Sequence, residues 1–488
     1  MKRKEADFSA IAVDMGAGSI RVMLATLVED RISLEEIHRI ENEIRVKNGR
    51  DTWDMKQITR EILWGISKAI EASPEPPISV GVDSWGVDFV LLDTNAELVE
   101  TPVAYRDKRT EGMQEQWRKL MSDQDTFTRT GINFYIFNTL YQLLSMKGGW
   151  ALQRTSEILF VPSYISYLLS GEAVNELSIA STSQMLGVDG TAWEKPILEK
   201  LELDEEKLGR VIPAGTILGP VVHPEIGENR MECVAVCGHD TACVVAALPV
   251  ENSNFAFISA GTWCIVGIES TQPLISEEAL QLGITNERGY GSTYRPLKNI
   301  VGLWLLQGLK KHLSSEITFA QMEALVQGQE DVSQVIDPDD PDFYNPAHMK
   351  EAFDSYFVKT AQPLPERFSD YICCAYDSLC FSFRYHMEQL EKLSKRPIEV
   401  LHVVGGGSQS DYLCQRIASI CEREVISGPV EGAAMGNVLI QGIAMKKIEN
   451  LQAGRDLVRR SCGVKRYRPE APLALVEERY RLYLKLKT

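Results

Sequence analysis

The sequence lacks the features that mark membrane proteins, secreted proteins and several common classes of nucleotide-binding protein. Among its 488 residues there is no run of 18 or more apolar residues, so a membrane span is not expected. Residues 1–10 are charged and contain no apolar core, so a secretory signal is not expected either. The G-x-x-x-x-G-K-[S/T] loop, the H-E-x-x-H zinc motif and the motif set of protein kinases are also missing. The chain is therefore not a P-loop enzyme, a zinc protease of that type or a protein kinase.

Positively charged residues are fewer than negatively charged ones. The chain has 51 Lys and Arg against 68 Asp and Glu, which gives a formal net charge of −17. Nucleic acids and anionic membranes are bound by basic surfaces, so neither is an expected partner. An anionic small ligand is not excluded, because a few backbone amides and one metal ion can reverse the field within a cleft.

Paired cysteine motifs are missing too. No C-x-x-C metal signature occurs, and several of the ten cysteines lie in apolar runs. We therefore expect reduced, buried cysteines in a cytoplasmic protein. The ten are Cys233, Cys237, Cys243, Cys264, Cys373, Cys374, Cys380, Cys414, Cys421 and Cys462.

Two segments share one pattern. Residues 11–24 read IAVDMGAGSIRVML and residues 255–266 read FAFISAGTWCIV, each with two apolar runs around a turn of small residues. The pattern predicts a β-hairpin in each half of the chain. We place a domain boundary between residues 247 and 254, which gives domains of 1–248 and 249–488.

Strands and helices alternate through both halves, which is typical of an α/β fold. The first half predicts two buried strands in 78–92 broken at 84–86, a helix over 156–170, a strand over 232–237 and a helix over 242–248. The second half predicts a strand over 398–404 and helices near 302–312, 371–393, 410–421, 432–444 and 474–486. The acidic stretch 337–342 is predicted to be a solvated loop.

Three turns are candidate phosphate or nucleotide sites. The turn after Asp14 consists of Gly, Ala and Ser, so its backbone N–H groups can approach an anion without obstruction by a Cβ atom. Asp14 would hold water on Mg²⁺, and Arg21 would reach a phosphate. The Gly-Thr turn at Thr262 can donate N–H and O–H groups, and the glycines of 405–408 would pack flat against a base or ribose. Plain tight turns are the alternative for all three.

Asp240, in the segment GHDT, is the strongest candidate for chemistry. It follows a predicted strand and precedes a predicted helix, which is where ligands bind in α/β folds. An ionised carboxylate there can accept the proton of an attacking hydroxyl. The alternative is that Asp240 only caps the helix. Trp85, in DSWGVD, would offer a sugar an aromatic face, and its alternative is a buried core residue.

Taken together and in order, the motifs resemble the FGGY family of carbohydrate kinases, and within it the rhamnulokinase group most. The resemblance is collinear from about residue 10 to about residue 470. It is carried by VDMGAGSIRVMLA from Val13, WDM from Trp53, GVDSWGVDFVLLD from Gly81, YRDKRT from Tyr105, GHDTACVVAALP from Gly238, SAGTWCIVGIE from Ser259, YRPLKNIVGLWLLQ from Tyr294, VVGGGSQ from Val403 and GPVEGAAMGN from Gly428.

The resemblance implies roles for individual residues. Asp240 would be the catalytic base, and ATP with Mg²⁺ would be bound, with no metal ligand assigned. The sugar site would contain Gly86, His239, Asp240, Thr241 and Asn299. The ATP site would contain Ala17, Gly18, Ser19, Ile20, Arg21, Thr262, Gln307 and Gly406. Ile20 stands where the family has a glycine, and the segment EGAA from Glu431 lacks the usual Thr, so we expect a stiffer first turn and altered ATP affinity.

The resemblance also implies an architecture and a reaction. We expect two RNase H-like lobes of the actin and hexokinase type, with mixed sheets and the active site in the cleft between them. The first domain would bind the sugar and the second the nucleotide. The reaction would be phosphorylation of L-rhamnulose at its 1-hydroxyl by ATP, in L-rhamnose catabolism.

Several alternatives stay open. The substrate could be another ketose such as L-fuculose or a pentulose. A catalytically silent sugar sensor on the same fold is a further alternative, and the acidic net charge and Asp240 argue against it. Monomer and homodimer are both compatible with the sequence.

Overall fold

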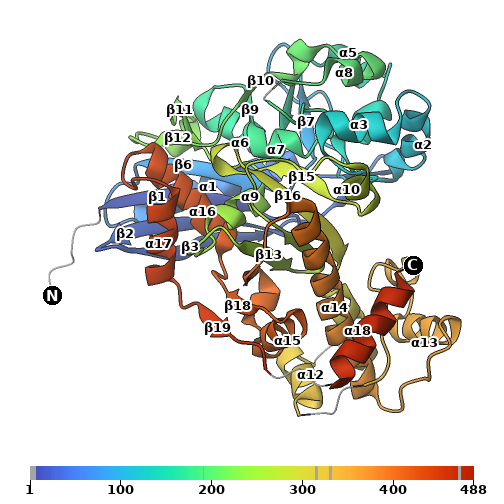
Figure 1. Ribbon diagram of the computed structural model, residues 1–488. Helices are drawn as coiled ribbons and strands as arrows, with labels where there is room; N and C mark the ends of the chain where they lie inside the picture. Colours follow the sequence, from blue (N-terminus) through green and yellow to red (C-terminus); the bar gives the residue numbers. More distant parts are fainter. Residues whose placement is uncertain (1–6, 191, 314–316, 329–331, 471–473, 488) are drawn as a thin grey trace. The chain divides into compact units, whose positions relative to one another are not determined.

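The chain forms two compact units, shown with their elements in Figure 1. The structure is a computed structural model that describes residues 7–190, 192–313, 317–328, 332–470 and 474–487. Unit 1 comprises residues 1–249, 270–296 and 432–462, and unit 2 comprises residues 250–269, 297–431 and 463–488. That domain 1–248 binds the sugar and domain 249–488 binds the nucleotide stays a prediction.

Unit 1 is built on a sheet with the strand order β11-β12-β6-β1-β2-β3. The predicted first hairpin is present: β1 (Phe8–Met15) and β2 (Ser19–Val28) are antiparallel, and β3 (Arg31–Glu41) continues the antiparallel part. β6 (Ser79–Ser84) is parallel to β1, β12 (Glu232–Ala235) is parallel to β6, and β11 (Thr216–Pro220) forms an edge. The carboxyl ends of β1, β6 and β12 therefore meet at one end of the sheet.

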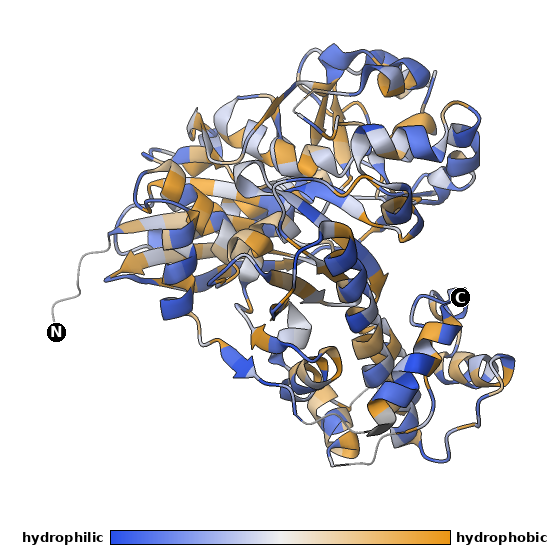
Figure 2. Cartoon of the chain, in the orientation of Figure 1, coloured by the Kyte–Doolittle hydropathy of each residue, from blue (hydrophilic) through white to orange (hydrophobic). Residues whose placement is uncertain are grey.

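Alternate residues of β1 face two different cores. Ile11, Val13 and Met15 pack with α1 (Met55–Ala72) and α6 (Val161–Ser170). Ala10 and Ala12 pack with α16 (Gly432–Ala444) and α17 (Leu451–Ser461). A strand with helices on both faces is apolar on both, and Figure 2 shows hydrophobic colour along the inner strands and more hydrophilic colour on the outer helices.

The remaining elements of unit 1 form smaller sheets and short helices. The strands of the smaller sheets are β4 (Arg45–Lys47), β5 (Arg50–Thr52), β7 (Phe89–Leu92), β8 (Glu157–Phe160), β9 (Val174–Glu176) and β10 (Arg210–Ile212). β15 (Thr285–Arg288) is instead the neighbour of β16 in the seven-stranded sheet. The helices are α2 (Met113–Arg118), α3 (Asp123–Thr130), α4 (Thr139–Leu144), α5 (Trp150–Arg154), α7 (Leu177–Ser181), α8 (Lys195–Leu201), α9 (Asp240–Ala246) and α10 (Glu277–Gln281).

The prediction of one helix over 156–170 is wrong in its first part. Residues Glu157–Phe160 form β8, which pairs antiparallel with β7, and the helix α6 begins only at Val161. The run Ile158 to Phe160 is fully buried against β7, so tertiary packing determines its conformation. Pro162 lies in the first helical turn, where its missing N–H is not needed.

Unit 2 repeats the strand order of unit 1. β13 (Phe255–Ala260) and β14 (Trp263–Gly267) form the predicted second hairpin, and residues 297–301 of β16 (Tyr294–Val301) pair antiparallel with β14. β17 (Val400–Val404) is parallel to β13, β18 (Glu424–Ser427) is parallel to β17, and β19 (Lys465–Tyr467) follows at the edge. The order β16-β14-β13-β17-β18 corresponds to β3-β2-β1-β6-β12, so both units have the RNase H-like topology that was predicted.

The helices of unit 2 are α11 (Trp304–Leu313), α12 (Phe319–Val326), α13 (Met349–Lys359), α14 (Phe368–Ser394), α15 (Asp411–Cys421) and α18 (Ala474–Leu486). Four of them, α11, α14, α15 and α18, lie within a few residues of the predicted ranges, and α12 and α13 were not predicted.

The prediction of a solvated loop over 337–342 is wrong for its first half. The side chains of Asp337 and Asp339 are only 14% and 17% exposed, and both pair with Lys487, at 2.8 and 3.3 Å. Asp339 also accepts a hydrogen bond from the backbone N–H of Val301, at 3.0 Å. The acidic residues therefore connect the segment after α18 to the end of β16.

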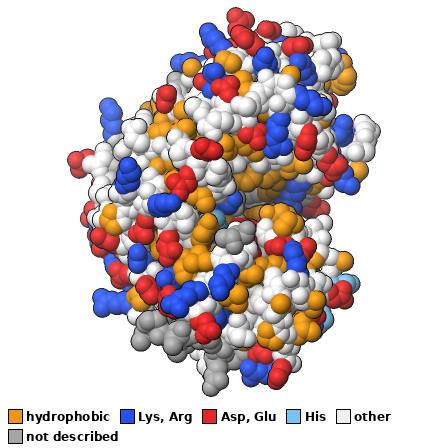
Figure 3. Space-filling model, turned by 45° about the vertical axis from the view of Figure 1, so that its right-hand side comes forward, with side chains coloured by type: hydrophobic (Ala, Val, Ile, Leu, Met, Phe, Trp, Pro, Cys, Tyr) orange, Lys and Arg blue, Asp and Glu red, His pale blue; other side chains and the backbone are white. Residues whose placement is uncertain are grey.

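The cysteines and the surface agree with the sequence analysis. All ten cysteines are free thiols and nine are buried. On the face shown in Figure 3, acidic and basic side chains are interspersed. Within the described ranges, no helix is both long and apolar enough to cross a membrane. The prediction made for residues 1–10 falls mostly on residues 1–6, which lie outside the described residues.

Candidate active site

Three carboxylates gather at the carboxyl ends of the parallel strands of unit 1. Asp14 near the end of β1 and Asp83 near the end of β6 are direct register partners, so their side chains lie on the same face of the sheet. Ser84 forms a bridge with His239, which places Asp240 beside the end of β6. This end of a parallel sheet is where α/β proteins bind ligands.

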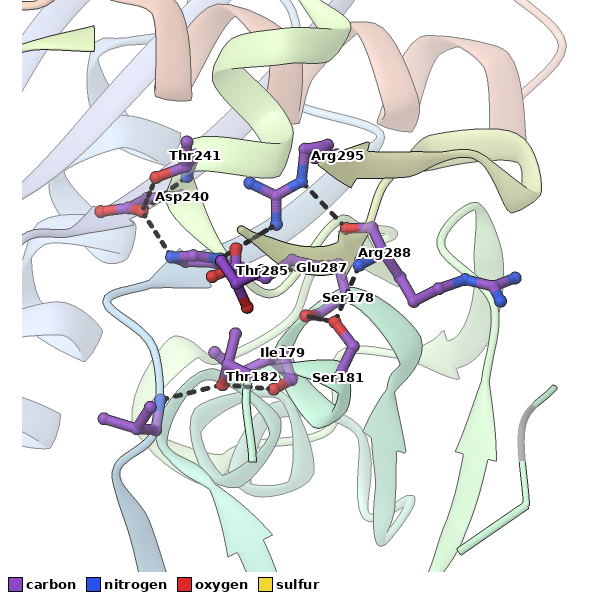
Figure 4. A network of polar contacts seen from close by, with 12 residues as sticks. Ser178, Ile179, Ser181, Thr182, Asp240, Thr241, Thr285, Glu287, Arg288 and Arg295 are labelled. Carbon is purple, nitrogen blue, oxygen red and sulfur yellow. Dashed lines mark hydrogen bonds and ion pairs between the residues drawn. The ribbon is translucent and has the colours of Figure 1, made fainter. Parts of the chain in front are cut away.

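Asp240 is the first residue of α9, and its carboxylate is held through one oxygen. Oδ1 accepts hydrogen bonds from the backbone N–H of Thr241 at 2.5 Å and from its hydroxyl at 3.1 Å. His239 Nε2 lies 3.4 Å from the same oxygen. Figure 4 shows these contacts converging on one oxygen while the other points away from the network. The side chain is 31% exposed, so the second oxygen can receive a proton.

The alternative that Asp240 only caps a helix is therefore incomplete. His239, and not Asp240, occupies the cap position of α9, and its side chain makes no capping hydrogen bond. The contact of Asp240 with Thr241 N is local, and among the described residues the hydrogen bonds and ion pair of Asp240 all involve Oδ1.

His239 lies between two carboxylates. Its Nδ1 is 3.0 Å from Oε2 of Glu287 on β15, and Nε2 faces Asp240. Arg295 on β16 is fully buried, and one of its terminal nitrogens is 3.0 Å from both Glu287 Oε2 and His239 Nδ1. Burial alone would raise the pKa of Glu287, but the charges and hydrogen bonds of His239 and Arg295 lower it to about 2.

Glu176 at the end of β9 fixes the backbone just before His239. Its Oε2 accepts hydrogen bonds from the N–H of Gly238 at 2.7 Å and from the N–H and hydroxyl of Ser178 at 2.9 and 2.6 Å. The Ser178 hydroxyl in turn accepts from the N–H of His239 at 3.2 Å. Burial raises the pKa of Glu176, and these hydrogen bonds oppose the shift. One buried carboxylate thus holds α7 and the segment that leads to Asp240 together.

Gly86 lies in a turn that α7 also supports. The next residue, Val87, has φ of 67°, a conformation that a β-branched residue adopts only at a cost. The turn is held by hydrogen bonds from Val87 N to the hydroxyl of Thr182 at 3.1 Å, and from the hydroxyl of Thr139 to Val87 O at 2.7 Å. The backbone at Gly86 is therefore fixed by its neighbours, which is typical of a binding site.

Trp85 is a core residue and offers a sugar no aromatic face. It is 6% exposed and packs against Trp53, with ring centroids 4.6 Å apart. Both indole N–H groups donate to Asp88 Oδ2, at 2.6 and 3.0 Å. Burial raises the pKa of Asp88 to about 6, against the opposing effect of these hydrogen bonds. Of the two interpretations of Trp85, a sugar-binding face and a buried core residue, the second is correct.

The first hairpin turn, Gly16 to Gly18, is braced from β3. The side chain of Asn42 donates to Gly16 O and its backbone N–H donates to Gly18 O, both at 3.1 Å. Ser19 begins β2, and the side chain of Ile20 is 1% exposed and packs in the core below the turn. The side chain of Ile20 is thus unavailable to a nucleotide, and a stiffer first turn stays a prediction.

The other predicted hairpin residues lie in the turn and at the start of β2, and their contact with phosphate stays a prediction. Ala17, Gly18 and Ser19 are at least partly exposed. Arg21 pairs with Asp14, at 2.5 Å.

The carboxylates offer the oxygen ligands that Mg²⁺ prefers. Asp83 is fully buried and accepts a hydrogen bond from Asn437 on α16 at 2.7 Å, and its Oδ1 has no hydrogen-bond partner among the described residues. Burial and the charge of Asp14 raise the pKa of Asp83 well above its usual range. Across the described parts of the chain, no three His, Cys, Asp or Glu side chains are arranged to hold a metal ion. A magnesium ion that is bound mainly through phosphate and water, with one carboxylate, here Asp14, fits this arrangement.

In unit 2, three of the predicted ATP residues surround the second hairpin turn. Gln307 donates to the hydroxyl of Thr262 at 3.1 Å. The glycines on both sides of Gly406 pack on Ala260, where an added Cβ would lie 3.0 Å or less from it. Asn299 is opposite Ile265 in the sheet, further from the turn. The structure thus brings the predicted residues together in two sets, one in each unit, and the sharing of one ligand by both sets stays a prediction.

Sequence reasoning missed the residues that support the site. These are Asn42, Asp83, Glu176, Glu287, Arg295 and Asn437. Each is separated in sequence from the residue it supports or has no motif of its own, and only the tertiary structure brings them together. A weak signal existed for Asp83, Arg295 and Asn437, which lie inside motifs that carry the family resemblance.

Comparison with known proteins assigns the family. Residues 9–247 match the N-terminal domain of the FGGY family of carbohydrate kinases, and residues 256–445 match its C-terminal domain. The chain belongs to the FGGY family of carbohydrate kinases. It is accordingly an enzyme that phosphorylates a carbohydrate, which confirms the predicted family and enzyme class.

Curated relatives within the FGGY family match over almost their whole length. The chain is 37% identical to a rhamnulokinase from Bacteroides thetaiotaomicron, covering 94% of this chain and 95% of the relative. It is 34% identical to a rhamnulokinase from Bacillus subtilis, with the same coverage, and 35% identical to one from Enterococcus faecalis, with 97% of each covered.

Solved structures confirm the fold. A xylulose kinase from Rhodospirillum rubrum aligns with a TM-score of 0.81 at 16% identity, over 98% of this chain and 97% of the other. A glycerol kinase from Plasmodium falciparum with ADP aligns with a TM-score of 0.81 at 13% identity, over 98% and 96%. The predicted α/β fold of two lobes of the actin and hexokinase type is therefore confirmed.

Proposed function

We propose that this FGGY kinase transfers the γ-phosphoryl group of ATP to the 1-hydroxyl of L-rhamnulose, giving L-rhamnulose 1-phosphate and ADP. The observation that carries the chemistry is Asp240, whose Oδ1 is held by Thr241 and His239 while Oδ2 faces outward. The choice of L-rhamnulose is supported by the rhamnulokinases that match over at least 94% of the chain.

Asp240 acts as the base in this reaction. As the sugar oxygen attacks the γ-phosphorus, its proton passes to Asp240 Oδ2, and the bond from the γ-phosphorus to the bridging oxygen of ADP breaks. Gly86, His239 and Thr241 border the same end of the sheet and would position the sugar, together with Asn299 of unit 2. Positioning and electrostatics supply most of the acceleration in phosphoryl transfer, so the fixed turn at Val87 and the braced carboxylate suit this chemistry.

The nucleotide would be held by both hairpins. Ala17 to Arg21 would contact the phosphates through backbone N–H groups, with Ile20 contributing only its backbone, and Thr262, Gln307 and Gly406 would contact ATP from unit 2. Asp14 would hold Mg²⁺, directly or through water, and the ion would neutralise charge on the phosphates when bound. We propose that the reaction takes place in the cytoplasm, where ATP is available.

A coupled assay of ADP release tests the proposal. The substrates are L-rhamnulose, L-fuculose, L-xylulose, D-xylulose, L-ribulose and glycerol, each with Mg-ATP. We expect the highest kcat/KM with L-rhamnulose, and loss of turnover when a chelator removes the divalent cation. A higher value with another ketose would change the substrate, and no turnover with any of them would refute the proposal.

The variant Asp240→Asn tests the base. We expect kcat to fall by a factor of about 10²–10⁴, the usual contribution of a general base, with little change in KM. Asp123→Asn is the matched control, because Asp123 is also the first residue of a helix, α3. Equal activity of Asp240→Asn and the parent enzyme would show that another group accepts the proton.

A further inference from the structure

Glu287, Arg295 and His239 form a chain of contacts that ends at Asp240, and it comes from three separate elements. Glu287 lies on β15, Arg295 on β16 and His239 just before α9. Figure 4 shows Glu287 and Arg295 in the same network of contacts as Asp240 and Thr241. None of these contacts is needed to form α9, whose hydrogen bonds are local, so the chain of contacts calls for a separate explanation.

We infer that Glu287 and Arg295 are positioning residues, which keep an N–H of His239 directed at Asp240 Oδ1 and so leave Oδ2 free to take the proton of the sugar hydroxyl. This inference rests on the proposed function. It adds two residues to the catalytic machinery that touch neither substrate in the proposed mechanism.

The geometry explains why both partners are needed. One terminal nitrogen of Arg295, Glu287 Oε2 and His239 Nδ1 lie 3.0 Å from one another. When Nδ1 carries no proton, Arg295 can donate to it, and the ring proton is then on Nε2. When Nδ1 is protonated, it can donate to Glu287, and the charged ring again has a proton on Nε2. In both states Nε2–H faces Asp240.

The remaining tautomer keeps the hydrogen bond to Glu287 but makes unfavourable contacts with both Asp240 and Arg295. With a proton only on Nδ1, the lone pair of Nε2 would face the Asp240 carboxylate, and Arg295 would face a donor in place of an acceptor. The pair therefore selects the ring states that hold Asp240 in place. The distance of 3.4 Å from Nε2 to Oδ1 is longer than a full hydrogen bond, and such catalytic contacts tighten when substrate binds.

The burial of these groups makes the arrangement rigid. Arg295 is fully buried, and the side chains of Glu287 and His239 are 12% and 13% exposed. Arg295 also donates through Nε to the carbonyl of Arg288 at 3.0 Å, and the N–H of Arg288 donates to the hydroxyl of Ser181 on α7 at 2.9 Å. The same helix, α7, carries Ser178, which holds the N–H of His239. The ring and its two partners are thus anchored to one helix.

A double-mutant cycle between Glu287→Gln and His239→Asn tests the inference in the full-length enzyme. We expect Glu287→Gln to lower kcat about tenfold, as loss of an orienting partner does elsewhere, with the KM for ATP changed less than twofold. In the His239→Asn background, Glu287→Gln should have no further effect on kcat, because its influence passes through the ring. Equal fold losses in both backgrounds, or an unchanged kcat in folded Glu287→Gln, would overturn the inference.

Two further variants separate positioning from general loss of structure. Glu287→Gln leaves the buried Arg295 without its anionic partner, so the double variant Glu287→Gln, Arg295→Gln removes both charges together and should show the same loss of kcat. Asp377→Asn is the matched control, because Asp377 is also a buried carboxylate between arginines, Arg416 and Arg479, but lies in unit 2. A loss of kcat in Asp377→Asn equal to that in Glu287→Gln would refute a specific role. The parent enzyme and Asp240→Asn decide the proposed function independently of these variants.

Discussion

Replacing Glu176 by alanine should destabilise unit 1 and slow the reaction together, because one oxygen of Glu176 serves four donors. Those donors are the N–H groups of Gly238, Ser178 and Ile179 and the hydroxyl of Ser178, at 2.6–3.3 Å. Each buried donor left without a partner costs about 1–3 kcal/mol. Water entering the space of the lost side chain would satisfy some of them, so we expect a net loss of about 3 kcal/mol in the free energy of unfolding.

Glu176→Gln separates the acceptor from the charge. Glutamine keeps an acceptor oxygen for the Gly238 amide, and it removes a carboxylate whose pKa is raised by burial. We therefore expect Glu176→Gln to lose less than about 1 kcal/mol, the net value of a typical hydrogen bond. The kcat of Glu176→Ala should fall about tenfold, because Gly238 lies two residues before Asp240 and a small misplacement of a catalytic group is costly.

Urea unfolding followed by tryptophan fluorescence measures the stability effect. Six of the eight tryptophans lie in unit 1, so the signal reports mainly on that unit. The quantities are the change in midpoint at constant slope and the kcat at 25 °C. A midpoint and kcat of Glu176→Ala equal to those of Glu176→Gln would refute the reasoning. The acceptor oxygen of residue 176 would then contribute neither to stability nor to kcat.

Three further predictions follow from the supporting residues. Asn42→Ala should raise the KM for ATP about fivefold, the equivalent of one hydrogen bond, because Asn42 holds the first hairpin turn. The KM for the sugar should not change. Asn229→Ala, in another turn, is the control. The pKa of Glu287 is about 2 in the folded protein against an ordinary 4.5, so its stabilisation, about 3 kcal/mol, is present above pH 4.5 and is lost as the pH falls from 4.5 towards 2. The difference in unfolding free energy between the parent enzyme and Glu287→Gln should accordingly shrink over that range, and a constant difference would contradict the shift. Gly436→Ala should lower the free energy of unfolding by about 3 kcal/mol, because the new Cβ would lie 1.8 Å from the carbonyl oxygen of Cys243 and push α9 from α16. Gly454→Ala is the control, because an added Cβ there comes no closer than 3.2 Å to another atom. A melting temperature of Gly436→Ala equal to that of the parent enzyme would contradict the packing.

The supporting residues also show where prediction from sequence stopped. The hairpins, some helices such as α14 and α16, and the position of Asp240 after a strand were predictable because their signals are local: alternation of apolar residues, turns of small residues and a carboxylate at a strand end. Residues 157–160 were misassigned because an apolar run of this length fits a strand or a helix, and pairing with β7 decides between them. Trp85 stayed ambiguous because an indole beside acidic residues suits either a sugar or a core, and only its burial against Trp53 distinguishes the two.

The sequence by itself determined the family, the two hairpins and the identity of Asp240 as the candidate base, because all three depend on residues that are close together in the chain. Only the tertiary structure decided what holds that base in place. Glu176, Glu287 and Arg295 lie 64, 47 and 55 residues from Asp240 in sequence, and they reach the site because β9, β15 and β16 bring them there. Such contacts arise from the packing of strands and helices that are far apart in sequence, so a local pattern of residue types does not predict them.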